Sequence, residues 1–310
     1  MKTKHFKAVL LSTLVIVALM VPTITLLSVD LVSAQWPENV IVQGSGVCYS
    51  NDKTVPPPSK PYEAGEMPPI MVAKRIGAGA VVAAGIGRTC NGGIKYATQR
   101  WTNGELDVLL DCALQWMVEN AKNVLWYGSE GGKYSVYNEA DKCSNLIATL
   151  FDKGYRVESK DIAPITSSLL DPYDILILPG LQIGKGTPDG GDPDLFPDAD
   201  VAAIVDFVKV KGRGLFIMDS GDYDGFCFHR VSNKILEALE FGFFFQHDTV
   251  ADPETDPAEL KYVTVDVNAN AFGADYRTAT GKTTITLYKV PSLTMPVPGV
   301  TVEIAPKYQE

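Results

Sequence analysis

Aspartates crowd two polar stretches of the sequence that each follow a run of apolar residues. The first stretch follows the run 175–178, and the second follows the run 215–218. Carboxylates separated by a single residue suit a hard cation such as Ca²⁺, which binds about six to eight oxygen ligands. The candidate ligands for calcium are Asp189, Asp192, Asp194, Asp222 and Asp224. The complete calcium loop with its distal glutamate is absent, so the competing interpretation is a pair of solvated acidic loops with helix-capping aspartates.

One serine and two histidines are the candidates for nucleophilic catalysis. Ser220 stands in the polar stretch after 215–218, and His229 and His247 are the histidines outside the N-terminal segment. A serine hydroxyl needs an adjacent base to attack a substrate, and neither histidine lies at a recognisable spacing from Ser220. The competing interpretation is that Asp219 and Ser220 satisfy main-chain donors in a turn, and that His229 begins a helix or lies on the surface. We expect no catalytic residue and keep the Ser220 pair as the alternative.

A third set of residues suits the binding of a small polar ligand. The polar loop 129–135 follows an apolar run, and tyrosines in such loops stack on the C–H faces of sugar rings while carboxylates bind the hydroxyl groups. The expected ligand-binding residues are Ser129, Glu130, Tyr134, Gln182, Asp219, Asp222 and Tyr223. The competing interpretation of each is ordinary loop packing.

The elements that position these residues alternate between short apolar runs and amphipathic segments from Asn123 onward. This alternation is typical of a parallel sheet covered by helices. The run 175–178 is apolar at every position, as a strand buried on both faces requires. A helix is expected from Asn138 to the stop at Gly154, and further helices follow near 198–211 and 235–239.

Two segments flank this block. Residues 251–310 are rich in Thr, Val, Pro and Gly without a helical period, which predicts a β-rich excursion near the C-terminus. Residues 37–118 predict a hairpin of strands at 70–75 and 79–85, followed by a helix from Leu106. The expected fold is therefore α/β, a mainly parallel flavodoxin-like sheet with helices on both faces plus the β-rich excursion.

Several motifs resemble the class I glutamine amidotransferase-like superfamily, in the noncatalytic branch that includes ThuA-like proteins and a domain of intraflagellar-transport proteins. They are NVLWYG at 123–128, the helix from Asn138, YDILILPG at 173–180 and VAAIVDFVKVKGRGLFIMDSG at 201–221. Catalytic members of the superfamily carry a cysteine or serine on a sharp turn that maps onto 216–221. Asp219 stands at the cysteine position here, and Met218 stands where the turn needs a small residue. The resemblance therefore implies a protein without the amidotransferase nucleophile.

The order of the matching segments is shifted along the chain. The hairpin and helix of 37–118 are similar to the closing portion of such domains, yet they precede the first strand at Asn123. Residues 37–118 alone offer too little apolar surface to fold, and the block 123–310 lacks a final strand and a covering helix. We expect one circularly permuted domain over 35–310. The alternative is an array of two units in which both end units are incomplete.

The N-terminus reads as an export segment over residues 1–34. Lys2, Lys4 and Lys7 precede an uncharged stretch from Ala8 to Val29, and small residues at 33–34 resemble a cleavage site. The uncharged stretch would span roughly 33 Å as a helix, so a retained membrane anchor stays open. Either outcome places the body of the protein outside the cytoplasm, secreted or anchored to the outer face of the membrane. The protein is then expected to contact the membrane only through this segment.

Charge and cysteine content are consistent with that location. Loss of residues 1–34 removes three lysines and one aspartate, which changes the formal charge from −10 to −12 and argues against nucleic acid as a partner. Structural disulfides are expected among Cys48, Cys90, Cys112 and Cys143, with Cys227 left over. Buried reduced thiols are the alternative.

These observations favour a noncatalytic extracytoplasmic protein that binds a carbohydrate or a cell-surface component, with no cofactor other than a possible Ca²⁺. A secreted hydrolase that uses Ser220 or the loop carboxylates is the first alternative. A structural component of the cell surface is the second.

Overall fold

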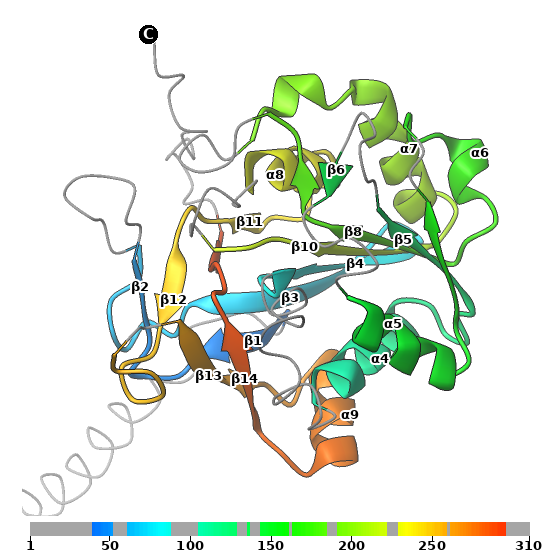
Figure 1. The fold of residues 1–310 in the computed structure, drawn as a ribbon. Helices are drawn as coiled ribbons and strands as arrows, with labels where there is room; N and C mark the ends of the chain where they lie inside the picture. Colours follow the sequence, from blue (N-terminus) through cyan, green and yellow to red (C-terminus); the bar gives the residue numbers. More distant parts are fainter. Residues whose placement is uncertain are drawn as a thin grey trace, which may run out of the picture. The chain divides into compact units, whose positions relative to one another are not determined.

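A nine-stranded sheet organises the chain in the computed structural model, with the strand order β14-β13-β1-β3-β4-β10-β8-β5-β7 (Figure 1). The structure describes residues 39–51, 61–87, 105–128, 135–136, 143–160, 163–184, 191–221, 229–258 and 261–295. The N-terminal export segment expected over 1–34 lies outside these residues. Among the residues in these ranges, no helix has the length and apolar character needed to cross a membrane.

One half of the sheet is parallel. Its strands are β4 (Gly79–Ala84), β10 (Gly214–Met218), β8 (Ile175–Pro179), β5 (Asn123–Tyr127) and β7 (Arg156–Lys160). Each pairs in parallel with its neighbours in that order. Every residue of β8 and β10 is buried, as their unbroken apolar runs predict for strands covered on both faces. The expected α/β class with a mainly parallel sheet is confirmed.

The other half is antiparallel. It consists of β3 (Pro69–Ile76), β1 (Val40–Gly44), β13 (Tyr262–Val267) and β14 (Thr284–Tyr288). The β3–β4 hairpin joins the two halves, because β4 also pairs with β10. Gly77 turns this hairpin with φ of 57°, a backbone conformation that favours glycine. Strands from before and after Asn123 therefore share one sheet.

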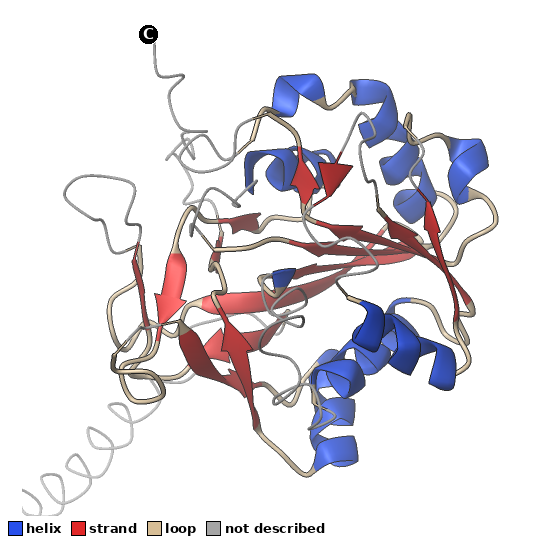
Figure 2. Cartoon of the chain, in the orientation of Figure 1, coloured by secondary structure: helices blue, strands red, loops and turns tan. Residues whose placement is uncertain are grey.

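Helices cover both faces of the sheet (Figure 2). One layer contains α4 (Leu106–Met117), α5 (Ser144–Asp152) and α9 (Ala271–Thr280). The opposite layer contains α6 (Ser167–Leu170), α7 (Asp198–Lys209) and α8 (His229–Ala238). Small ladders add β2 (Tyr49–Asn51) with β12 (Thr249–Ala251), β11 (Phe244–Phe245) with β15 (Leu293–Thr294), and β6 (Ser135–Val136) with β9 (Leu181–Gln182).

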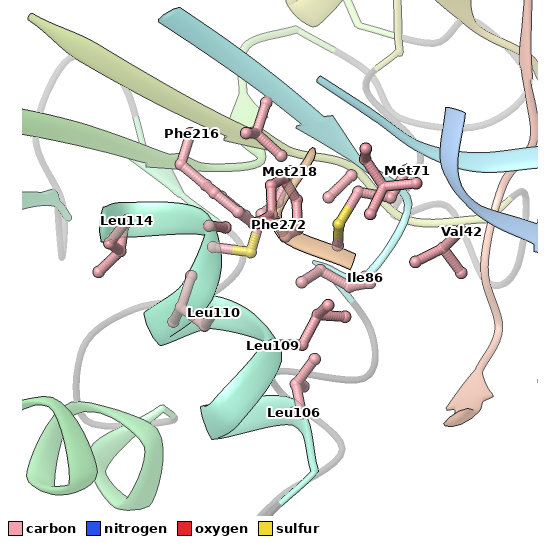
Figure 3. Packing of buried hydrophobic residues seen from close by; sticks show 14 of the residues in the cluster. Val42, Met71, Ile86, Leu106, Leu109, Leu110, Leu114, Phe216, Met218 and Phe272 are labelled. Carbon is pink, nitrogen blue, oxygen red and sulfur yellow. The ribbon is translucent and has the colours of Figure 1, made fainter. Parts of the chain in front are cut away.

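The core between the sheet and the α4 layer is apolar (Figure 3). Leu109, Leu110 and Leu114 of α4 are buried there together with Phe216 and Met218 of β10. Burying a side chain of this size contributes about 1.5–3 kcal/mol relative to leaving it exposed. The helical spacing of apolar residues in 106–117 thus predicts both the helix and its buried face correctly.

One prediction about the C-terminal region is wrong. Residues 251–310 were expected to contain strands without a helix, yet α9 lies between β13 and β14. Its buried aromatic residues, Phe272 and Tyr276, stand four positions apart, and Gly281 ends the helix in the left-handed conformation with φ of 69°. The helix carries too few apolar residues to show a clear period, and its contact with α4 positions it in the fold.

Candidate ligand-binding edge

The carboxyl ends of β5 and β8 lie at a switch point of the sheet. The chain passes from β5 to β7 on one side of β5, and then to β8 on the other side. The order β7-β5-β8-β10-β4 corresponds to the doubly wound order 2-1-3-4-5, with the fifth place taken by a strand that precedes the other four in the chain. Ligands of open α/β sheets bind outside the carboxyl ends of strands at such a point.

Segments that follow β5 and β8 are tied to each other. Ser135 pairs with Gln182, and Val136 pairs with Leu181, in the antiparallel ladder of β6 and β9. Gly180 precedes that ladder with φ of 78°, which lets the chain turn sharply at the end of β8. The structure therefore brings the backbone of Gln182 next to the residue that follows Tyr134.

Asp192, one of the expected metal ligands, has a structural partner. Its Oδ1 accepts a hydrogen bond from the main-chain N–H of Asp194 at 3.0 Å and caps the 3₁₀ helix η2 (Pro193–Leu195). Its own N–H donates to the carbonyl of Ile183 at 2.7 Å. Asp194 is exposed. Within the described ranges, no group of three or more His, Cys, Asp or Glu side chains could hold a metal ion.

Helix α8 anchors the segment after β8. The Nζ of Lys234 donates to the carbonyls of Pro193 and Phe196 at 3.0 and 2.7 Å, and lies 2.7 Å from Oδ1 of Asp198. Because α8 follows β10 in the chain, it couples the connection after β8 to the connection after β10. One helix thus contacts the segment that follows β8 and begins where the connection after β10 ends.

Asp219 follows β10 directly and is a buried residue with 1% of its surface exposed. Its Oδ1 accepts a hydrogen bond from the N–H of Ser220 at 2.8 Å, and its carbonyl accepts one from Gly87 at 2.9 Å. Neither Asp219 nor Ser220 has a positive φ. A nucleophile elbow exposes its reactive side chain on a sharp, strained turn, whereas Asp219 and Ser220 have no positive φ and Ser220 is only 2% exposed.

A set of buried polar residues packs beside this turn, and no motif or spacing in the sequence indicates it. A Cβ on Gly221 would lie 2.6 Å from Oγ1 of Thr249 and 3.2 Å from the carbonyl of Lys289. Lys289 is 4% exposed and adopts φ of 48°, which is uncommon outside glycine. Asp248 is fully buried and accepts hydrogen bonds from the N–H and Oγ of Ser292 at 2.7 and 2.5 Å.

The two candidate bases lie against each other. The ring centroids of His229 and His247 are 5.0 Å apart, with an angle of 34° between the ring planes. His229 is the first residue of α8 and is 9% exposed, so it begins a helix as expected but does not lie on the surface. The spacing of the two histidines in the sequence does not predict this contact. It arises because the chain turns back through β11 after α8.

Several expected site residues lie outside the described residues. They are Ser129, Glu130, Tyr134, Asp189, Asp222, Tyr223 and Asp224. The described residues are therefore the framework from which these loops emerge, at the ends of β5, β8 and β10.

The expected disulfide framework is not seen in the part of the chain that the structure describes. No disulfide joins Cys48, Cys112 and Cys143 to one another. Burial raises the pKa of the Cys48 thiol, and burial with the nearby Asp111 carboxylate raises the pKa of Cys112 to about 11. Cys90 and Cys227 lie outside the described residues.

Comparison with protein-family models, with curated proteins and with solved structures finds no match to this chain. The assignment of a function therefore depends on the geometry of the carboxyl edge and on the resemblance of the sequence motifs.

Proposed function

We propose that the protein is a noncatalytic binding protein of the class I glutamine amidotransferase-like superfamily that acts outside the cytoplasm. Its ligand, a carbohydrate or a cell-surface component, binds the loops at the carboxyl ends of β5, β8 and β10. The observation that carries this proposal is the end of β10. There a buried aspartate bonds its own turn, where a catalytic relative would expose a thiol or hydroxyl.

Two further features support the binding role. The β6–β9 ladder joins segments that follow β5 and β8, beside the switch point where ligands of open α/β sheets bind. The acidic balance of the chain disfavours nucleic acid, whereas carboxylates and tyrosines in the neighbouring loops suit hydroxyl groups and sugar faces. The proposed extracytoplasmic location rests on the export segment predicted for residues 1–34. The proposal of a bound Ca²⁺ rests on the aspartates of the loops alone.

A serine-reactive fluorophosphonate probe tests the absence of catalysis. We expect no stoichiometric labelling of the native protein, because Ser220 is buried and does not adopt a positive φ. Labelling that disappears in the Ser220→Ala variant would instead establish the secreted hydrolase.

A glycan array tests the ligand class. We expect binding of the purified protein to a subset of glycans, with loss of that signal in Tyr223→Ala and Asp222→Asn. Asp152→Asn is the matched control. Asp152 is exposed and precedes the amino end of β7, whereas the proposed site lies at the carboxyl ends of the strands. A signal lost equally in all three variants, or no signal for any glycan, would contradict a carbohydrate ligand.

A further inference from the structure

Strand β14 forms one outer edge of the nine-stranded sheet. The N–H of Val267 donates to the carbonyl of Thr283, and the N–H of Lys289 donates to that of Lys261, each at 2.8 Å. In an antiparallel pair the bonded positions alternate, so Ile285 and Leu287 direct their main-chain groups to β13. The groups of Thr284 and Thr286 consequently point outward, away from the sheet.

The outward groups are open at the middle of the strand. The carbonyl of Thr284 accepts a hydrogen bond from the hydroxyl of Tyr276 in α9 at 3.0 Å. Thr286 is exposed, and among the described residues no strand pairs with its outer side. An exposed row of unpaired N–H and C=O groups is a template for another strand.

The two edges of the sheet differ in charge. The opposite edge, β7, carries Arg156, Glu158 and Lys160, and the last two form an ion pair at 3.2 Å. Charged side chains of this kind block the pairing of one edge with another. Strand β14 reads TITLY and has no charged residue and no proline. Among the strands that the structure describes, β14 is thus the sheet edge without charged residues.

A row of three threonine hydroxyls runs from the turn before β13, over β13, to this edge. Oγ1 of Thr255 lies 2.9 Å from Oγ1 of Thr264, which lies 3.1 Å from Oγ1 of Thr286. Thr264 and Thr286 stand directly opposite each other in the register of β13 and β14, and cross-strand threonine pairs of this type stabilise a sheet. The row ends at Thr286, the central residue of the edge strand.

We propose that β14 is a dimerisation edge whose occupant is β14 of a second copy of this chain, antiparallel about a two-fold axis at Thr286. Thr286 then bonds Thr286 of the partner subunit through both main-chain groups, and Thr284 faces Tyr288 of the partner subunit. Ile285 faces Leu287 of the partner subunit on the covered side. No like charges oppose each other within the strand, and the threonine row continues across the axis.

Sedimentation equilibrium on the purified protein tests this edge. We expect a dimer at about 100 µM, and we expect Thr286→Lys to raise its dissociation constant by about tenfold or more, because two ammonium groups would meet at the axis. Thr278→Lys is the matched control, since Thr278 is exposed on α9, and it should remain dimeric. A monomeric wild type, or a dimer that survives Thr286→Lys, would overturn the proposal.

Cross-linking tests the register independently of any loss of folding. Cα atoms of a hydrogen-bonded antiparallel pair are about 5.5 Å apart, within the range of a disulfide. Mild oxidation should therefore link Thr286→Cys into a covalent dimer, whereas Thr284→Cys should stay unlinked because its partner position is Tyr288. Equal cross-linking of both variants, or of neither, would contradict the two-fold axis at Thr286.

Discussion

Ser135 and Gln182 are direct partners in the two-residue ladder of β6 and β9. This pairing joins the connection after β5 to the connection after β8, on the two sides of the sheet's switch point. Helix α8 then holds the second connection through Lys234, which contacts the carbonyls of Pro193 and Phe196. The proposed binding edge is thus built on supports that come from three different parts of the chain.

Gly79 should tolerate no side chain, because the β3–β4 hairpin lies directly on the α7–β10 connection. A Cβ at Gly79 would lie 2.3 Å from the carbonyl oxygen of Arg213 and 2.5 Å from that of Val208. We expect Gly79→Ala to lower the free energy of unfolding by about 1–3 kcal/mol. Gly46→Ala has open space around it and should change that free energy by less than about 0.5 kcal/mol. Urea unfolding of the two variants measures the difference, and similar values would refute the close approach.

Asp174 should stabilise the fold in a pH-dependent way. Burial alone would raise the pKa of its carboxyl, but the N–H groups of Asn123 and Lys122 and the Arg213 guanidinium outweigh it and lower the pKa. A carboxyl whose pKa is lowered by folding stabilises the folded protein at pH values above its ordinary pKa. This stabilisation is lost as the pH falls through the pKa of the carboxyl in the folded state. We expect Asp174→Asn to cost about 2 kcal/mol at neutral pH.

The difference in the free energy of unfolding between wild type and Asp174→Asn should shrink as the pH falls below about 4. Denaturant unfolding at a series of pH values measures this difference, with Asp171→Asn as the control. Asp171 is an exposed carboxylate that is paired with Lys211, and exposed pairs contribute little. A difference that grows toward acid pH would show that the sign is wrong.

Cys112 should react slowly with alkylating reagents. Its pKa of about 11 leaves little thiolate at pH 8, and burial is the main cause. We expect slow modification of Cys112 by iodoacetamide in the native protein and rapid modification in denaturant, followed by mass spectrometry of the peptides. If Cys112 is instead recovered in a disulfide, the structural disulfides expected from the sequence would stand, and the half-buried free thiol would be contradicted.

Much of the framework could be predicted from local patterns. The unbroken apolar runs of β8 and β10 identified buried parallel strands, and the apolar face of 106–117 identified α4. Helix α9 was missed because its burial depends on Phe272, Tyr276 and contact with α4, a tertiary effect that overrides weak local periodicity.

The candidate site was predictable only in part. That loops at the ends of β5, β8 and β10 share one edge follows from parallel topology, and Asp219 lies directly after β10, as its position behind the apolar run predicts. Asp248 and Lys289 were missed, because segments distant in sequence bring them to Gly221. Asp192 looked like a metal ligand, but aspartate before a short helix serves equally as a cap, and the sequence alone does not separate the two roles.

Amide hydrogen exchange with and without an oligosaccharide selected on the glycan array shows where the ligand binds. A ligand held at the carboxyl ends of β5, β8 and β10 should slow exchange in peptides that cover 128–136, 180–184 and 219–228, with no change in β13 or β14. Protection confined to β13 and β14, or to any surface away from the carboxyl ends of β5, β8 and β10, would contradict binding at this edge.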